Sequence, residues 1–327
     1  MSQGSDPAIT VVPELSLGLF ALFALANLSG YNSDNQWEFS LVRRTVRSKL
    51  ASHGKHWRSA LDKVGLLPYI QRGGGGRLMD IVPQLSPPDL AWAPRALARV
   101  SWQRDSSQLL RDLETILGDF LREEAIVDLW SSLGHLYEEA ARMLQPAFGT
   151  LEAIAQRFGE PRDRDALTVH VVPNLLDAHG RGYSVSSGNQ TWLFLGPVQN
   201  AEQGTEIAVH ELVHRWIDWA CDQYSPFGRA PDPMPQARAE FRIVAELYPE
   251  FPIWVGETIV RAATAWLISS PRYLERQATS ELLSYYERIG FVGVSGAYEL
   301  FAQQLSIPNA LDEVIHSVVD KVLERFS

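Results

Sequence analysis

The sequence has one cysteine, Cys221, among 327 residues, so an intrachain disulfide and a cysteine-rich zinc module are excluded. Basic residues are also scarce, because 29 Lys and Arg stand against 39 Asp and Glu, a net charge of −10. This balance argues against nucleic acid and anionic lipid as partners, since both bind basic surfaces. Apolar residues (46%) and charged residues (21%) occur at the levels of an ordinary globular protein.

The sequence also lacks an apolar run long enough to cross a bilayer. Its longest run, residues 15–28, is shorter than the roughly 20 residues that a spanning helix needs. Ala24-Leu25-Ala26 imitates a signal-peptide cleavage site, but the first basic residue is Arg43, whereas such signals begin with basic residues. We therefore favour a buried helix over a signal peptide, and a cytoplasmic location over a secreted one.

Helical spacing of apolar residues dominates the first half of the chain. It occurs over residues 14–66 and again over residues 95–160. Between them lie four glycines at 73–76 and a proline-rich stretch at 83–94, which excludes regular helix because proline lacks an N–H and clashes with the preceding turn. We predict a helical N-terminal lobe over residues 1–160.

Strand-like composition occurs in one region of the sequence. Residues 167–172 (LTVHVV) and 192–195 (WLFL) predict strands, and residues 183–185 are a weaker candidate for a third. From about residue 199 to the end the pattern is helical again. The expected fold class is therefore α+β with helix dominant, and the second part, 161–327, holds strands at about 167–195 and a helical C-terminal lobe.

The residues that carry chemistry are His210-Glu211-Leu212-Val213-His214, an HExxH motif. On an α-helix, with about 100° per residue, the two histidines lie on one face one turn apart and can bind one metal ion. Glu211 lies about 100° from His210, where it can take a proton from a water bound to the ion. Zinc suits such a site because it accepts nitrogen and carboxylate ligands and keeps a fourth position open for catalysis.

The surrounding residues predict a buried helix over about 205–222. Asn200 and Gln203 fit a capping box, and Thr205 is a second candidate for the N-cap. The side of this helix opposite the histidines is apolar, with Ala208, Val209, Leu212, Trp216, Trp219 and Ala220. An alternative without metal is a pair of core histidines, with Glu211 paired to Arg215.

Asp218 follows His214 by one helical turn. A metal-binding imidazole usually donates its second N–H to a carboxylate or carbonyl, which fixes its tautomer. Asp218 is therefore a candidate to orient His214, although an ordinary partner at the helix end explains it equally well.

The third ligand must be an acidic residue, because no histidine follows His214 until His316. The candidates are Asp222, Asp232, Glu240, Glu246, Glu250 and Glu257. We favour Glu257, because it lies in an apolar stretch where an unpaired carboxylate is costly and metal coordination would satisfy it. Glu246 and Glu240 remain alternatives, and an ion pair with the arginine four residues later would explain Glu257 without metal.

Residues 210–218 (HELVHRWID) resemble the active helix of thermolysin-like gluzincin metallopeptidases, in which an aspartate follows the second histidine by four residues. In those enzymes a glutamate from a later helix is the third ligand, which implies Glu257 here. The resemblance departs at Arg261, where the gluzincin pattern has an aspartate. More narrowly, the chain resembles a family of predicted bacterial HExxH peptidases, through a helix opening at Pro13-Glu14-Leu15, Gly30-Tyr31-Asn32, the HExxH helix, and a Gly256-Glu257 helix leading to Gly290-Phe291.

The resemblance implies a zincin-like catalytic region. An extended peptide would pair with an edge strand before His210, at 183–185 or 192–195. A side chain would also stabilise the tetrahedral intermediate, for which Tyr286 is favoured, followed by Tyr298. Tyr285 and His179 are weaker candidates.

The sequence thus predicts a zinc metallopeptidase that hydrolyses peptide bonds through a zinc-bound water activated by Glu211. The expected partner is a peptide or protein substrate, with no nucleic acid and no membrane span, and the oligomeric state is left open. The alternatives are a non-catalytic zincin-like protein that binds metal or peptide, and a helical interaction protein in which HExxH is coincidental.

Overall fold

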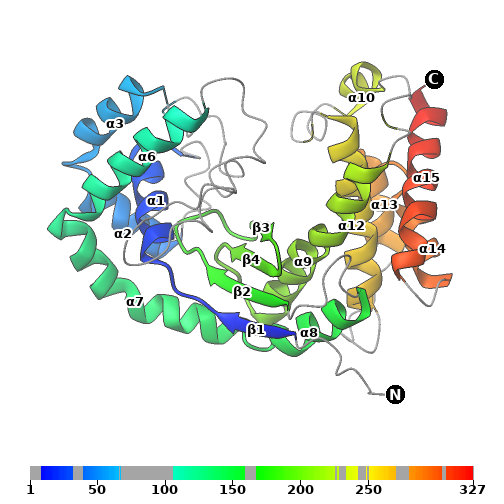
Figure 1. Ribbon diagram of the computed structural model, residues 1–327, viewed down its shortest axis with the longest axis horizontal. Coiled ribbons are helices and arrows are strands. Elements are labelled where there is room, and N and C mark those ends of the chain that lie inside the picture. Colours follow the sequence, from blue (N-terminus) through cyan, green and yellow to red (C-terminus); the bar gives the residue numbers. More distant parts are fainter. Residues whose placement is uncertain are drawn as a thin grey trace. The chain divides into compact units, whose positions relative to one another are not determined.

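The computed structural model of the chain (Figure 1) describes residues 9–31, 40–65, 67, 106–158, 167–224, 227, 233–241, 248, 250–269, 280–303 and 307–326. The glycines at 73–76, the proline-rich stretch at 83–94 and the predicted helical residues 95–105 lie outside this part.

The chain forms two compact units. The sheet unit comprises Val11–Pro146 and Thr168–Ile207, and the C-terminal unit comprises Met1–Thr10, Ala147–Leu167 and Ala208–Ser327. The two units are defined by how compact each one is. They do not test the division that the sequence predicts at residue 160, which stays a prediction. The chain is a helix-dominant α+β protein, as the composition indicated.

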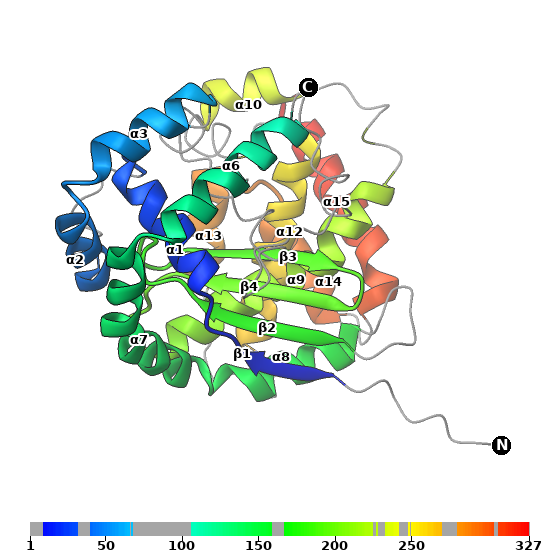
Figure 2. The same cartoon turned by 60° about the vertical axis from the view of Figure 1, so that its left-hand side comes forward.

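A four-stranded mixed sheet has the order β1-β2-β4-β3 (Figure 2). Its strands are β1 (Thr10–Pro13), β2 (Thr168–Pro173), β3 (Gly182–Ser187) and β4 (Gln190–Leu195). β2 and β4 are parallel, whereas β3 and β4 form an antiparallel hairpin. The strands predicted at 167–172, 183–185 and 192–195 are confirmed.

β1 was not predicted, and the helix expected to open at Pro13-Glu14-Leu15 was wrong there. The N–H groups of Thr10 and Glu14 donate to the carbonyls of Leu167 and Val171, at 2.9 and 3.0 Å, so this stretch borders the sheet. The helix begins four residues after Pro13, because the Ser16 side chain accepts the N–H of Leu19 at 3.0 Å and caps it.

Five described helices belong to the sheet unit: α1 (Leu17–Leu28), α2 (Leu41–Lys49), α3 (Gly54–Lys63), α6 (Ser106–Leu121) and α7 (Glu124–Leu144). The apolar run at 15–28 forms α1, whose residues from Gly18 to Asn27 are buried, as predicted. α1 packs against α2, α3, α6 and α7, and α7 contacts β2. None of the described helices has the length and apolar character needed to span a membrane.

A polar cluster lies inside the sheet unit and joins α1 and α2 to the turn after β2. Arg43 has no exposed surface, and it donates to the Asn27 side chain and, at 2.8 Å, to the Tyr31 carbonyl. The Tyr31 hydroxyl donates to Asp177 at 2.9 Å and accepts from Arg181 at 3.1 Å. Burial lowers the pKa of Arg43 to about 10, so the guanidinium remains charged at neutral pH.

We expect Gly196→Ala to lower the free energy of unfolding by about 1–3 kcal/mol, the usual cost of overpacking. A Cβ at Gly196 would lie 2.4 Å from the carbonyl oxygen of Ala178, so the backbone would have to move. Urea denaturation measures the change. Gly118→Ala in α6 is the control, because nothing lies within 4 Å of its Cβ position and alanine favours a helix. Equal stability of the Gly196 variant and wild type would contradict this account.

The C-terminal unit is helical among the described residues. Its helices are α8 (Ala147–Phe158), most of α9 (Ala201–Gln223), α10 (Met234–Glu240), α12 (Phe251–Ser269), α13 (Ser280–Ile289), α14 (Val294–Gln303) and α15 (Ile307–Phe326). α12 packs against α14 and α15. At the turn after α13, Gly290 has φ +121°, and its carbonyl accepts the indole N–H of Trp254 at 3.0 Å. This bond ties α12 to the turn that carries Phe291.

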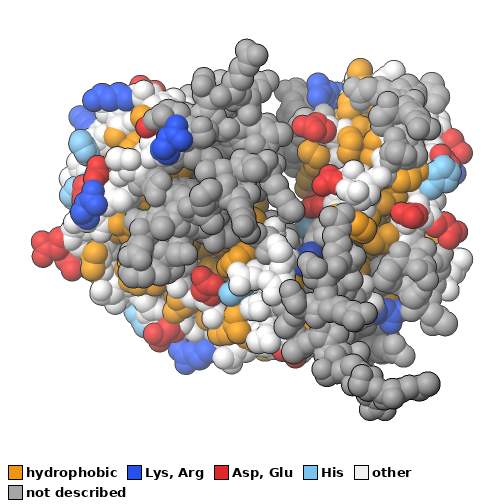
Figure 3. All heavy atoms as spheres, in the orientation of Figure 1, with side chains coloured by type: hydrophobic (Ala, Val, Ile, Leu, Met, Phe, Trp, Pro, Cys, Tyr) orange, Lys and Arg blue, Asp and Glu red, His pale blue; other side chains and the backbone are white. Residues whose placement is uncertain are grey.

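Charged side chains are dispersed over the visible face of the described residues (Figure 3). Acidic and basic groups are scattered there, without a continuous basic patch among the residues that are coloured by type. This distribution agrees with the net charge of −10.

Candidate metal centre

The HExxH helix α9 is capped by Asn200, as predicted, but only half of the predicted capping box forms, because Gln203 does not accept the N–H of Asn200. The Asn200 side chain accepts the N–H of Gln203 at 2.8 Å, and the Gln203 side chain accepts the N–H of Gln199 at 2.7 Å. The predicted alternative cap, Thr205, was wrong, because it lies inside the helix and its hydroxyl donates to the Ala201 carbonyl at 2.8 Å. α9 therefore starts about one turn earlier than the predicted residue 205, and the motif lies well inside a regular helix.

α9 presents both imidazoles of the motif together. The rings of His210 and His214 are 5.1 Å apart between centroids and inclined by 77°. Around them, the helix is held by buried apolar side chains, among them Ala208, Val209, Leu212, Val213, Trp216, Ile217, Ala220 and Cys221. Such packing on several sides keeps the two histidines in fixed positions.

α12 brings Glu257 to the two histidines. Its side chain is only 6% exposed, and Oε1 lies 3.5 Å from His210 Nε2 while Oε2 lies 3.5 Å from His214 Nε2. Among the described residues, these three form the one group of metal-ligand side chains whose donor atoms all lie within 4.8 Å of one another. The predicted association of residues 210, 214 and 257 is thus present in the structure.

The spacing of these donors fits a shared cation better than direct hydrogen bonds. Ordinary N–H···O bonds have N···O distances of about 2.7–3.2 Å, shorter than the separations found here. Two ligands of a tetrahedral zinc ion, each bound at about 2.0–2.1 Å, lie about 3.3–3.4 Å apart. Two neutral imidazole nitrogens and one carboxylate are a donor set that zinc accepts, and they leave a fourth position open.

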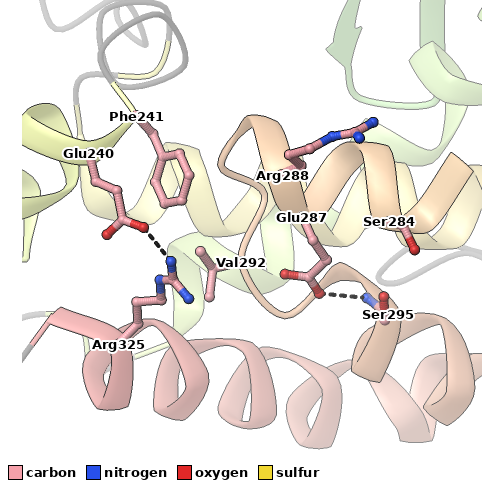
Figure 4. A pocket seen from close by; sticks show the side chains of 8 residues that line it. All are labelled: Glu240, Phe241, Ser284, Glu287, Arg288, Val292, Ser295 and Arg325. Carbon is pink, nitrogen blue, oxygen red and sulfur yellow. Dashed lines mark hydrogen bonds and ion pairs between the residues drawn. The ribbon is translucent and has the colours of Figure 1, made fainter. Parts of the chain in front are cut away.

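The other predicted acidic ligands that the structure describes, Asp222, Glu240 and Glu250, do not join this group. Glu240 pairs with Arg325 and lines a separate pocket of about 500 Å³ in the C-terminal unit (Figure 4). Asp222 and Glu250 are exposed, whereas Asp232 and Glu246 lie outside the described residues. The apolar stretch around Glu257 is buried at Trp254, Val260 and Thr264, whereas Ile253 is 48% exposed.

Asp218 contacts His214 as the spacing predicted. Its Oδ1 lies 3.0 Å from His214 Nδ1, on the ring nitrogen opposite the one that faces Glu257. Burial by itself would lower the pKa of His214, but Asp218, Glu211 and Glu257 outweigh it and raise that pKa to about 10. In the metal-free chain His214 is therefore protonated at neutral pH, so a metal must displace a proton from it.

Glu211 is buried beside the triad, with 7% exposure. Burial raises the pKa of its carboxyl, and the neighbouring His210 and His214 offset this only in part. A carboxylate in such surroundings accepts a proton more readily than one in water.

Glu257 also makes the ion pair that was the alternative to metal binding. Arg261 Nη2 lies 2.6 Å from Glu257 Oε1. Burial alone would raise the pKa of Glu257, but His210, Arg261 and His214 outweigh it and hold that pKa well below its usual range. The ion pair and the approach to the histidines therefore coexist and are not alternatives.

Sequence analysis missed Tyr248, whose hydroxyl lies 3.4 Å from Arg261 Nη2. Burial and the nearby Glu257 carboxylate raise its pKa. No sequence pattern marks this residue, because its place depends on contacts with Arg261 and Phe291 that only the fold creates.

The tyrosines proposed from the sequence differ in their surroundings. The ring of Tyr286 on α13 lies 5.2 Å from the Arg261 guanidinium carbon, so it belongs to the surroundings of Glu257. The Tyr298 hydroxyl lies 3.2 Å from Ser269 Oγ. Ser269 is twelve residues after Glu257 on α12, about 18 Å along the helix, which is far from the donors of the triad.

Comparison with known proteins adds no relative to these observations, since no family model, no curated protein and no solved structure matches the chain.

Proposed function

We propose that the chain is a zinc-dependent metallopeptidase of the gluzincin type. The observation that carries the proposal is the approach of Glu257 to both HExxH imidazoles at equal distances of 3.5 Å. His210, His214 and Glu257 would hold the ion, and Asp218 would orient His214 through its Nδ1. Zinc, when bound at such a site, supplies a Lewis acid that polarises a carbonyl and makes a water more acidic.

The protein's own part in hydrolysis falls to Glu211. Its carboxylate takes a proton from the attacking water and delivers it to the leaving amine. Burial beside the triad supports this role, because it raises the pKa of the carboxyl towards the range in which general bases work best. Tyr286 is the proposed donor to the tetrahedral intermediate, and its place beside Arg261 supports it.

Purified protein loaded with zinc tests the proposal. We expect one zinc per chain by elemental mass spectrometry, and new peptide termini when a mixture of peptides is incubated with the protein. A chelator should stop cleavage and added zinc should restore it. Stoichiometric zinc without cleavage would favour the non-catalytic alternative. Absence of zinc would favour a helical interaction protein in which the HExxH motif is coincidental.

Glu257→Gln should weaken zinc binding by more than about 100-fold, since even the outer partners of ligands contribute 10–100-fold. Glutamine keeps the size of the side chain and an oxygen that can face Arg261, so this substitution disturbs the packing less than alanine would, although the buried cation loses its charged partner. Competition with a chromophoric chelator measures the affinity. Glu250→Gln is the matched control, because Glu250 is exposed just before the same helix. Zinc affinity equal to that of wild type in Glu257→Gln would remove Glu257 from the ligand set.

A further inference from the structure

The guanidinium of Arg261 is held by groups from three parts of the C-terminal unit. It sits over the ring of Phe291, 4.3 Å from the centroid, and over the ring of Tyr286 at 5.2 Å. Tyr248 adds its hydroxyl, 3.4 Å from Nη2, and its ring lies 5.9 Å from that of Phe291. Cation–π contacts of this kind are favourable, and they strengthen when the cation is desolvated.

The surrounding backbone fixes these rings. Phe291 donates its N–H to the Tyr286 carbonyl at 2.9 Å, so the two aromatic residues are joined across the end of α13. Gly290 precedes Phe291, and its carbonyl accepts the indole N–H of Trp254 on α12. A Cβ at this glycine would lie 2.8 Å from Phe241. These contacts restrict the guanidinium, and Nη2 lies 2.6 Å from Glu257 Oε1.

A glutamate side chain has several rotatable bonds, and fixing them costs rotamer entropy. In Glu257 this restraint is already in place, because Arg261 contacts Oε1 while Oε2 faces His214. A planar guanidinium packed between rings orients a carboxylate in a way that a flexible ammonium does not. The cation also balances the charge of the buried carboxylate when no metal is present.

We propose that Arg261, clamped by Phe291, Tyr286 and Tyr248, is a positioning residue that presents Glu257 to the metal. The inference rests on the proposed zinc site and deepens it. Arg261 acts through Glu257 and does not touch the substrate. Its contribution is the preorganisation of the third ligand, which shows in metal affinity before any reaction takes place.

The test is the zinc dissociation constant of the full chain, measured by competition with a chromophoric chelator. Arg261→Met should weaken zinc binding by about 10–100-fold, the usual effect of losing a partner of a metal ligand. Arg261→Lys keeps the charge without the planar group, so it should fall between wild type and Arg261→Met. Arg288→Met, at an exposed arginine of the same unit, should bind zinc as wild type does.

A double-mutant cycle with Glu257→Gln separates positioning from general damage to the fold. If Arg261 acts through Glu257, adding Arg261→Met to Glu257→Gln should change zinc affinity far less than it does in wild type. Full additivity of the two changes would overturn the inference. Unchanged or tighter zinc binding in Arg261→Met would also overturn it, because repulsion between the guanidinium and the ion would then outweigh positioning.

If Arg261→Met fails to fold, the same cycle is measured with Arg261→Lys. Wild-type protein that takes up no zinc would remove the proposed function itself, and this inference with it.

Discussion

Glu211→Gln is expected to slow peptide hydrolysis by the zinc-loaded protein by about 10²–10⁴-fold, the range that general acid–base catalysis contributes. Glutamine has the shape of glutamate but accepts no proton at neutral pH. Glu211 is not one of the three donors that converge, so zinc should remain bound at one ion per chain. The rate and the zinc content are measured on the same preparations.

The stability of this variant should move in the opposite direction from its activity. The pKa of Glu211 is raised in the folded chain, so the ionised carboxylate destabilises the metal-free fold at pH values above its unfolded pKa. Removing the charge should therefore leave the melting temperature of the metal-free protein equal to or above that of wild type at pH 7. Asp222→Asn is the control, since Asp222 is exposed on the same helix. Hydrolysis at the wild-type rate in Glu211→Gln would refute the role of Glu211 as base.

The parts of the site that the sequence predicted are those with local rules. The distance between His210 and His214 is set by one turn of helix, and the cap at Asn200 depends on residues three positions apart. Both are therefore visible without knowledge of the fold. Asp218 follows the same rule, because it too is four residues from its partner.

Glu257 was predictable for a different reason. A carboxylate within an apolar stretch needs a partner, and this need can be inferred from composition even though the partner cannot. What composition could not tell is that Arg261 and the histidines all contact the same carboxylate. Tyr248 lacked any such signal, and the resemblance that included Phe291 gave it no role, because the contacts of both rings with Arg261 arise only when the chain packs.

The sheet shows the same limit. β2 and β4 were found from their own composition, whereas β1 is a four-residue strand defined by its bonds to residues 157 positions later. The first residues of β1 have β-type side chains, but Pro13 and Glu14 also suit the start of a helix. The helix starts only after Ser16, because the Ser16 side chain caps α1.

The sequence could not predict the buried polar cluster of the sheet unit, because its central residue, Arg43, is of a type that is expected at the surface. An arginine within a stretch of several basic residues, as in α2, is expected at the surface. Arg43 is instead fully buried, because Asn27, Tyr31 and Asp177 lie where they can satisfy or balance it. Such an arrangement combines residues more than 130 positions apart, and no local pattern predicts it.

Arg43→Met is accordingly expected to reduce the free energy of unfolding by about 3–5 kcal/mol, the cost of removing one partner from a buried charged group. Methionine fills similar space, but the Asn27 side chain and the Tyr31 carbonyl each lose a donor, and the buried Asp177 loses a nearby cation. Urea denaturation gives the change in midpoint, and the slope shows whether unfolding remains one transition.

The matched control is Arg44→Met, which alters the next residue of the same helix at an exposed position. A surface substitution of this kind should stay within about 0.5 kcal/mol of wild type. Because the chain comprises two compact units, hydrogen exchange of α1 and α2 is measured as well, and in Arg43→Met it should become faster there than in α12. If Arg43→Met matches Arg44→Met in both measurements, the cluster does not stabilise the sheet unit, since an apolar side chain then replaces its central cation without loss.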